Sequence, residues 1–138
     1  MLVEEIHSVV VATVDETGHP HTTVMDMMWE DGKTVYFLTA DFKPLYKRLK
    51  EDGRVAVTGM TQGAGTMDRK SISLTGQVEW IGKEHLEELL KANPYMYEIY
   101  PTEEGRSHLQ VFRFKNAVGN FYDLTQLPPY QARFEIEG

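Results

Sequence analysis

The sequence of 138 residues contains no cysteine, which excludes both a disulfide framework and a thiolate metal site within this chain. It also has no apolar run that approaches the length of a membrane span. Its first residues, MLVEEIHSVVV, carry acids where a secretory signal peptide carries basic residues. We therefore expect a cytoplasmic protein that does not insert into a membrane.

Positive charge is also scarce. Lys and Arg number 14 against 21 Asp and Glu, which gives a formal net charge of −7, and no run of basic residues occurs. This balance argues against nucleic acid or an anionic membrane as the main partner. With 41% apolar residues the chain can bury one core but not two, so residues 1–138 are expected to form a single domain.

Short β-branched or alternating stretches, separated by turn-forming residues, predict six or seven strands. In chain order these are 9–14, 21–29, 34–39, a stretch after Gly53, 71–81, 108–115 and 117–124. Residues 71–81 alternate most clearly, with apolar side chains on one face: Ile72, Leu74, Val78 and Trp80. The Pro-Pro pair in the tail TQLPPYQARFEIEG is expected to prevent regular pairing there.

Helical periodicity is limited to short segments. Residues 42–51 and 82–94 each place apolar side chains on one helical face, and PYMYEIYPTEEGR fits either a helical turn or an ordered loop. So many strands in a small chain favour a closed or nearly closed antiparallel barrel, because closure removes exposed strand edges.

The predicted strand 21–29 is apolar on both faces. Met25, Met27 and Trp29 share one face, whereas Val24 and Met28 share the other with Asp26 between them. A single small core covers only one face of such a strand. We therefore expect the second face to meet a partner subunit or a ligand.

The helix predicted at 42–51 carries lysines at its start. Asp41 is expected to cap it, Pro44 is tolerated in its first turn, and Lys43, Lys47 and Lys50 form a basic stripe. Because a helix N-terminus is itself partly positive, a first-turn Lys is unfavourable unless an anion is bound there. With Thr39 just before the helix, the stripe indicates either a phosphate site or a plain solvated face.

Other candidate motifs carry weaker signals. His19 and His21 in HPH lack a third ligand at a recognisable spacing, so no metal site is predicted. GMTQGAGTM contains Gly63 and Gly65, a fragment of a dinucleotide-loop pattern, but no following helix to receive a pyrophosphate, and is interpreted as a flexible connection. The aromatic residues of the second half of the chain fit either ligand stacking or ordinary packing; they are Tyr95, Tyr97, Tyr100, Phe121 and Tyr122. No side chain is assigned a catalytic role.

The stretch VATVDETGHPHTTVMDMMWEDGKTVYFLTADFKPLYKRLKEDGRVAVTG resembles the opening of the pyridoxamine 5′-phosphate oxidase-like family of flavin-binding split barrels. The similarity lies in the order of the motifs and covers roughly residues 9–82. ANPYMYEIYPTEE is similar to small general-stress-protein-type members of the same family. The resemblance implies a mainly β split barrel that forms a homodimer, with FMN bound at the subunit interface.

By position, the resemblance also implies which residues contact the flavin. Those along the isoalloxazine ring, mainly through backbone hydrogen bonds, would be Met25, Asp26 and Met27. Those around the phosphate would be Thr39, Lys43 and Lys47, and Ser71 would lie near the flavin from the barrel.

The implied activity is that of an FMN-dependent oxidoreductase acting on a small-molecule substrate or electron donor. The C-terminal residues with which the oxidases of the family grip their substrate have no counterpart here, so that substrate is not carried over. Three alternatives stay open. They are a noncatalytic flavin-binding or haem-binding protein, with a His or Met as the axial ligand of haem; a reductase that uses a diffusible deazaflavin; and a purely structural barrel.

Overall fold

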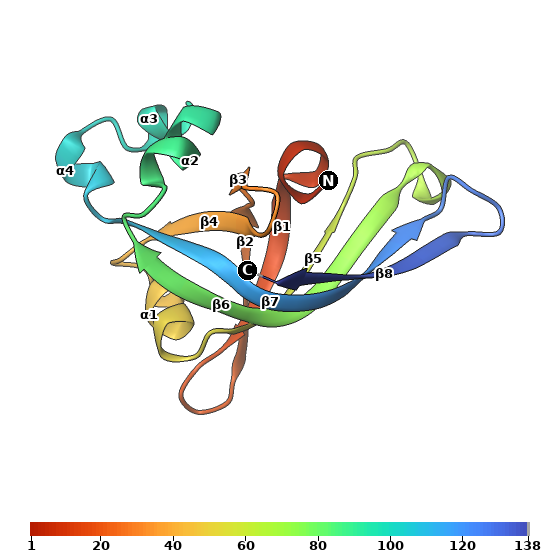
Figure 1. Cartoon of the computed structure of the whole chain (residues 1–138), viewed down its shortest axis with the longest axis horizontal. Helices are drawn as coiled ribbons and strands as arrows, with labels where there is room; N and C mark the ends of the chain where they lie inside the picture. The colour runs from red at the N-terminus through yellow and green to blue at the C-terminus, as the bar shows by residue number, and fades with distance from the viewer. Residues whose placement is uncertain (138) are drawn as a thin grey trace.

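The computed structural model describes residues 1–137, which form one antiparallel sheet curled into a barrel with short helices around it (Figure 1). The strands are β1 (Ser8–Val14), β2 (Pro20–Asp26), β3 (Trp29–Glu30), β4 (Val35–Ala40), β5 (Arg54–Met60), β6 (Lys70–Gly82), β7 (Leu109–Asp123) and β8 (Tyr130–Glu137). The helices are α1 (Pro44–Glu51), α2 (Leu86–Ala92), α3 (Met96–Ile99) and α4 (Glu103–Arg106), with single turns η1 (Leu2–Ile6) and η2 (Thr66–Asp68). The prediction of a mainly β split barrel is confirmed.

The barrel closes through the segment that joins β2 to β3. The strands follow the order β2-β1-β5-β6-β7-β4-β3, with β8 paired to β7, so the two ends of the order are consecutive in the chain. Met27 N–H donates to the carbonyl of His7, just before β1, at 2.7 Å, and Met28 N–H donates to the carbonyl of Tyr36 in β4 at 3.0 Å. This bent segment therefore bridges β1 and β4.

Aromatic side chains fill the centre of the barrel. Phe37, Phe112 and Phe114 are fully buried, and the rings of Phe37 and Phe112 stack with centroids 5.8 Å apart. Leu45 and Leu49 of α1 belong to the same apolar cluster. Burial of such side chains contributes about 1.5–3 kcal/mol each, which holds α1 against β1, β4 and β6.

A glycine allows the two longest strands, β6 and β7, to cross closely. A Cβ atom at Gly76 would lie 2.1 Å from the backbone oxygen of Asn116, a distance that no side chain tolerates. The pairing of the strands shifts at the next residues, between Gln77 and Val78. The strands thereby bend enough to enclose the core.

A second apolar cluster lies outside the barrel, where α2 and α3 pack on β4 and β7. Met28 belongs to it together with Leu89, Leu90 and Met96, and Asn93 Nδ2 donates to the carbonyl of Met28 at 2.9 Å. The second face of segment 21–29 is therefore covered at Met28 by helices of the same chain, whereas Val24 stays 70% exposed.

Four local expectations from the sequence are wrong. Segment 21–29 is two strands, because Met27 and Met28 form the bend, and the two strands predicted at 108–115 and 117–124 are one continuous strand, β7. The tail pairs with β7 from Tyr130 onward, because the Pro-Pro pair lies in the preceding turn. Trp80 is 43% exposed, since its ring packs beside Tyr46 of α1 instead of entering the core.

The start of α1 also differs from the prediction. The helix begins at Pro44, Lys43 is its N-cap residue in an extended conformation, and the carboxylate of Asp41 contacts His108 Nδ1 at 2.8 Å instead of capping the helix. The reason is steric, because the residue before a proline is disfavoured from helical geometry. Lys43 therefore precedes the first turn and does not lie within it.

Candidate functional site

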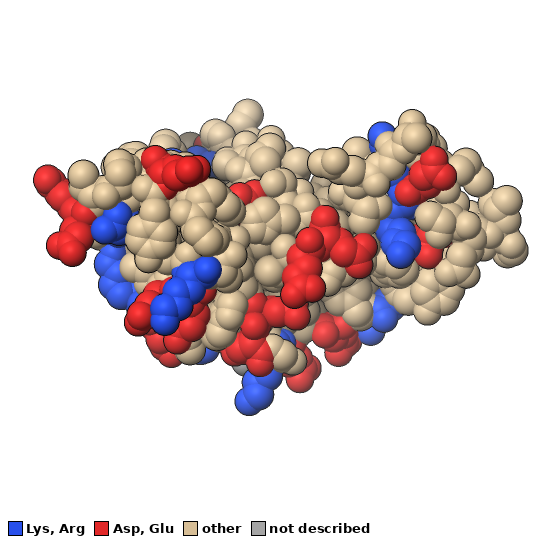
Figure 2. Space-filling view, turned by 90° about the horizontal axis from the view of Figure 1, so that it is seen from above, with Lys and Arg blue, Asp and Glu red and all other residues tan. Residues whose placement is uncertain are grey.

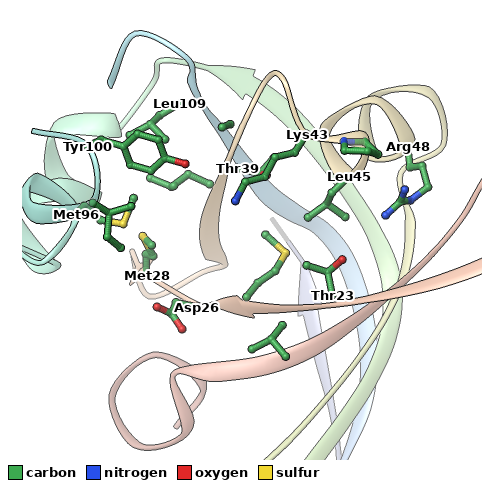
Figure 3. Close-up of a pocket in the computed structure, with 16 residues that line it drawn as sticks. Thr23, Asp26, Met28, Thr39, Lys43, Leu45, Arg48, Met96, Tyr100 and Leu109 are labelled. Carbon is green, nitrogen blue, oxygen red and sulfur yellow. The ribbon is translucent and has the colours of Figure 1, made fainter. Parts of the chain in front are cut away.

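A cavity of about 510 Å³ opens between β2, β4 and α1, with α3 on its other side (Figure 3). This volume lies within the range of small-molecule sites. The lining is mostly apolar and includes six polar side chains: Thr23, Asp26, Thr39, Lys43, Arg48 and Tyr100. We take this cavity as the candidate site.

Two cations lie on the α1 side of the cavity, namely Lys43 and Arg48. Arg48 occupies the helix face of buried Leu45 and Leu49, which turns its side chain inward. Its Nε donates to the hydroxyl of buried Thr13 at 2.8 Å, so the guanidinium is held in place while its terminal N–H groups stay available to an anion.

Asp26, the last residue of β2, supplies the negative charge of the cavity. Its Oδ1 accepts a hydrogen bond from Ser8 at 2.6 Å, and its Oδ2 accepts one from Tyr95 at 2.7 Å. Burial acts to raise the pKa of Asp26, but these hydrogen bonds and the nearby imidazole of His7 together hold it below its ordinary value. The carboxylate is therefore ionised at neutral pH.

His7 and Tyr95 form a hydrogen-bonded chain that ends at this carboxylate. His7 Nε2 lies 2.8 Å from the Tyr95 hydroxyl, and Nδ1 lies 3.0 Å from the carbonyl oxygen of Val3. Since a carbonyl only accepts, Nδ1 carries a hydrogen. Burial and the bond to Asp26 raise the pKa of Tyr95, so its hydroxyl keeps its proton for the carboxylate. We call Ser8, Asp26, Tyr95 and His7 the Asp26 cluster.

The free edge of β2 adds backbone groups to the site. Met27 N–H bonds to the residue before β1, and in an antiparallel pair the hydrogen-bonded residues alternate along the strand. The backbone groups of Val24 and Asp26 therefore point away from β1. They can bond to a flat ligand that lies along β2.

Only some of the residues predicted to contact a flavin line this cavity. Those that line the cavity are Met25, Asp26, Thr39 and Lys43. Met27 is fully buried in the barrel core, and Lys47 is exposed on the outward face of α1. Ser71 lies at the start of β6, beside Met60 and Tyr122, outside the cavity lining.

Sequence reasoning missed Arg48 and the Asp26 cluster. A signal for Arg48 existed, because it follows Leu45 by three residues and therefore shares the buried helix face. No comparable signal existed for the cluster, since His7 and Tyr95 are 88 positions apart. Their contact depends on how α3 packs beside β2.

Of the histidines of HPH, His19 lies on the turn between β1 and β2 and His21 lies in β2, where its ring is 2.8 Å from the Asp15 carboxylate. This contact, with bonds from Thr17 and His19, lowers the pKa of Asp15. Among residues 1–137, no group of three or more potential metal ligands comes together. The pair is accounted for by this turn.

The surface carries both signs of charge. On the face displayed in Figure 2, Lys and Arg occur in small separate groups among Asp and Glu, without a continuous basic area. None of the helices within residues 1–137 combines the length and apolarity needed to span a bilayer.

We compared the sequence and the fold of this chain with those of known proteins. The profile of the family described as Pyridoxamine 5′-phosphate oxidase matches residues 1–122. A comparison with curated proteins finds no match. A NimC/NimA family protein from Clostridium acetobutylicum superposes with a TM-score of 0.78 at 21% identity, covering 96% of this chain and 86% of that one.

Two further structures of similar fold are described with other cofactors. The haem storage protein HutZ from Vibrio cholerae has a TM-score of 0.60 at 16% identity, over 95% of this chain and 87% of that one. A protein described as an F420 reductase has a TM-score of 0.63 at 20% identity, over 82% and 88%. At these identities the likeness concerns the fold alone.

The Asp26 cluster predicts a pH-dependent contribution to stability. We expect Asp26→Asn to lower the free energy of unfolding at pH 7 by about 1–2 kcal/mol, because the amide loses charge-assisted bonds to Ser8 and Tyr95. The folded-state pKa of Asp26 lies below the unfolded value, so this contribution is complete above about pH 4 and is lost as the pH falls through the folded-state pKa.

Urea unfolding of both proteins tests this prediction. The difference in free energy should shrink between pH 7 and about pH 3. A difference of the same size at both pH values would contradict it.

Proposed function

Because the chain belongs to the pyridoxamine 5′-phosphate oxidase family, we propose that it binds FMN noncovalently in this cavity and acts as an FMN-dependent oxidoreductase. The observation that carries the proposal is the placement of Lys43 and Arg48 at one side of an otherwise largely apolar cavity. Bound FMN would supply the hydride or electron transfer, while the protein binds and orients it. Its partner would be a small-molecule substrate or electron donor.

The α1 side of the cavity suits a phosphate dianion. Lys43 supplies an ammonium group, and Arg48 supplies a guanidinium whose direction is fixed through Thr13. The hydroxyl of Thr39 lies on the adjacent strand and lines the same space. These groups support phosphate binding without requiring Lys47.

The remaining walls suit a flat ring system. Met28, Leu38, Met96 and Leu109 offer apolar surface, and the free backbone edge of β2 offers hydrogen bonds along one side. This arrangement supports the ring-contacting position expected for Asp26, whereas the backbone of Met25 is directed toward β1.

Haem fits this lining less well than FMN. None of the five histidines of the chain lines the cavity, so an axial ligand from the lining would be a thioether of Met25, Met28 or Met96. A phosphate-bearing deazaflavin would meet the same cations as FMN. Haem and a deazaflavin are therefore the two cofactors from which FMN has to be distinguished by experiment.

The cofactor is tested first on freshly purified protein. We expect a flavin absorption spectrum and release of FMN on heat denaturation. A haem spectrum, or binding of an added deazaflavin with no affinity for FMN, would contradict the assignment of FMN in favour of that cofactor. Failure to bind any of the three would leave a structural barrel.

The phosphate contacts are tested with ligands that differ only in phosphate. Lys43→Ala and Arg48→Gln should each weaken FMN roughly tenfold or more, with little effect on riboflavin, because riboflavin has no phosphate. Titrations followed by flavin fluorescence measure both affinities. Lys47→Ala is the matched control, and its outward position predicts a smaller effect. Equal weakening of FMN and riboflavin would contradict the assignment.

We also propose that the chain is a homodimer with flavin at the subunit interface. On the outer face of β1, β5, β6 and β7 lies a hollow of about 340 Å³ that contains no charged residue. Val10 and Val118 are 38% and 42% exposed there. A broad uncharged surface with exposed apolar residues is typical of a subunit contact.

The dimer is tested by placing a charge in this hollow. Val118→Glu should convert the dimer to a monomer, because an unpaired carboxylate would be buried on association. Light scattering coupled to size-exclusion chromatography measures the mass. Lys115→Ala, exposed on the same strand and equal in charge change, should leave the dimer intact. A monomeric wild-type protein would contradict the proposal.

A further inference from the structure

We propose that Asp26 determines which ring system the cavity accepts, by receiving a hydrogen bond from an imide N–H at the edge of a flat heteroaromatic ring. The inference deepens the proposed function and rests on it, because it concerns the same cavity. It gives the Asp26 side chain a role at a position where the family resemblance implies mainly backbone hydrogen bonds.

The Asp26 carboxylate retains unused acceptor capacity. A carboxylate offers about four lone-pair sites, of which Ser8 occupies one on Oδ1 and Tyr95 occupies one on Oδ2. Oδ1 therefore keeps one site, whereas Oδ2 also faces His7 Nε2 at 3.4 Å. The Asp26 side chain keeps 27% of its surface exposed. Because Asp26 lines the cavity, this spare capacity is open to a ligand.

The same carboxylate is held in a fixed orientation. One donor, Ser8, belongs to β1, and the other, Tyr95, is the residue just before α3. Two short bonds from separate elements fix both oxygens, so little reorganisation is needed when a donor arrives. A fixed, ionised acceptor forms stronger hydrogen bonds than a neutral one.

The layout of the cavity places Asp26 away from the cations that would hold the phosphate. Figure 3 shows Asp26 and Arg48 at opposite sides of the view, with Lys43 between them. A ligand whose phosphate meets Lys43 and Arg48 therefore presents its far end to Asp26. A donor N–H is attracted there, whereas a second anionic group is repelled.

This charge arrangement distinguishes classes of ligand. Flavins and deazaflavins carry an imide N–H on the ring, whereas the peripheral groups of haem are carboxylates. Asp26 therefore favours both flavin types over haem and leaves the choice between the two flavins to other contacts.

The experiment compares FMN with 3-methyl-FMN, in which the imide hydrogen is replaced by a methyl group. Wild-type protein should bind FMN roughly tenfold to a hundredfold more tightly than 3-methyl-FMN. In Asp26→Asn this ratio should fall about fivefold or more, because a neutral acceptor bonds more weakly. Asn has nearly the same shape, so a purely steric preference would survive the substitution.

The design isolates the hydrogen bond from other effects. Both ligands carry the phosphate, so removing a negative charge from the cavity affects them equally and cancels in the ratio. The ratio is also independent of the fraction of protein that is folded. Asp52→Asn, which removes the same charge from a surface carboxylate paired with Arg54, should keep the wild-type ratio.

The outcomes separate this inference from the proposed function. If wild-type protein binds FMN and 3-methyl-FMN equally, or if Asp26→Asn keeps the wild-type ratio, the role of Asp26 is overturned while FMN binding stands. If wild-type protein binds neither flavin, the proposed function is overturned and this inference with it.

Discussion

Closure of the barrel depends on the bent segment at Met27 and Met28, where two successive amides bond to opposite neighbours. The first amide ties the chain to the β1 side and the second ties it to β4, so β2 must end at Asp26. The candidate site follows from this constraint. It brings Asp26 to the cavity and leaves the outer backbone edge of β2 unpaired beside it.

Pro44 sets the other side of the site through its effect on the preceding residue. Because Lys43 is forced into an extended conformation, α1 begins at Pro44 and Lys43 is the residue just before the helix. The buried face of α1 then consists of Leu45, Leu49 and the adjoining Arg48. The cations of the site therefore come one from before the helix and one from its inner face, and not from a continuous basic stripe.

The strands were largely predictable from the sequence because their signal is local. Alternation in 71–81 and the β-branched run at 9–14 each predict a strand without knowledge of its neighbours. The flavin contacts that the family resemblance implies stay a prediction, and of them Met25, Asp26, Thr39 and Lys43 line the cavity. Sequence reasoning failed where a distant contact decides the outcome. The tail forms a strand because β7 offers a free edge for pairing. The Asp26 cluster forms because Tyr95, which is distant in the sequence, donates a hydrogen bond to Asp26 of β2.

The fold alone does not select a cofactor, since structures of similar fold are described as a haem storage protein and as an F420 reductase. Selection must therefore come from the few polar groups that this chain places in the cavity. A pair of cations favours a phosphate, an ionised acceptor favours an N–H donor, and the lining lacks an imidazole for an axial bond. Of the cofactors considered, a phosphorylated flavin satisfies the first two conditions and does not require the third. The physical argument for a phosphorylated flavin thus rests on the charges at the two ends of the cavity.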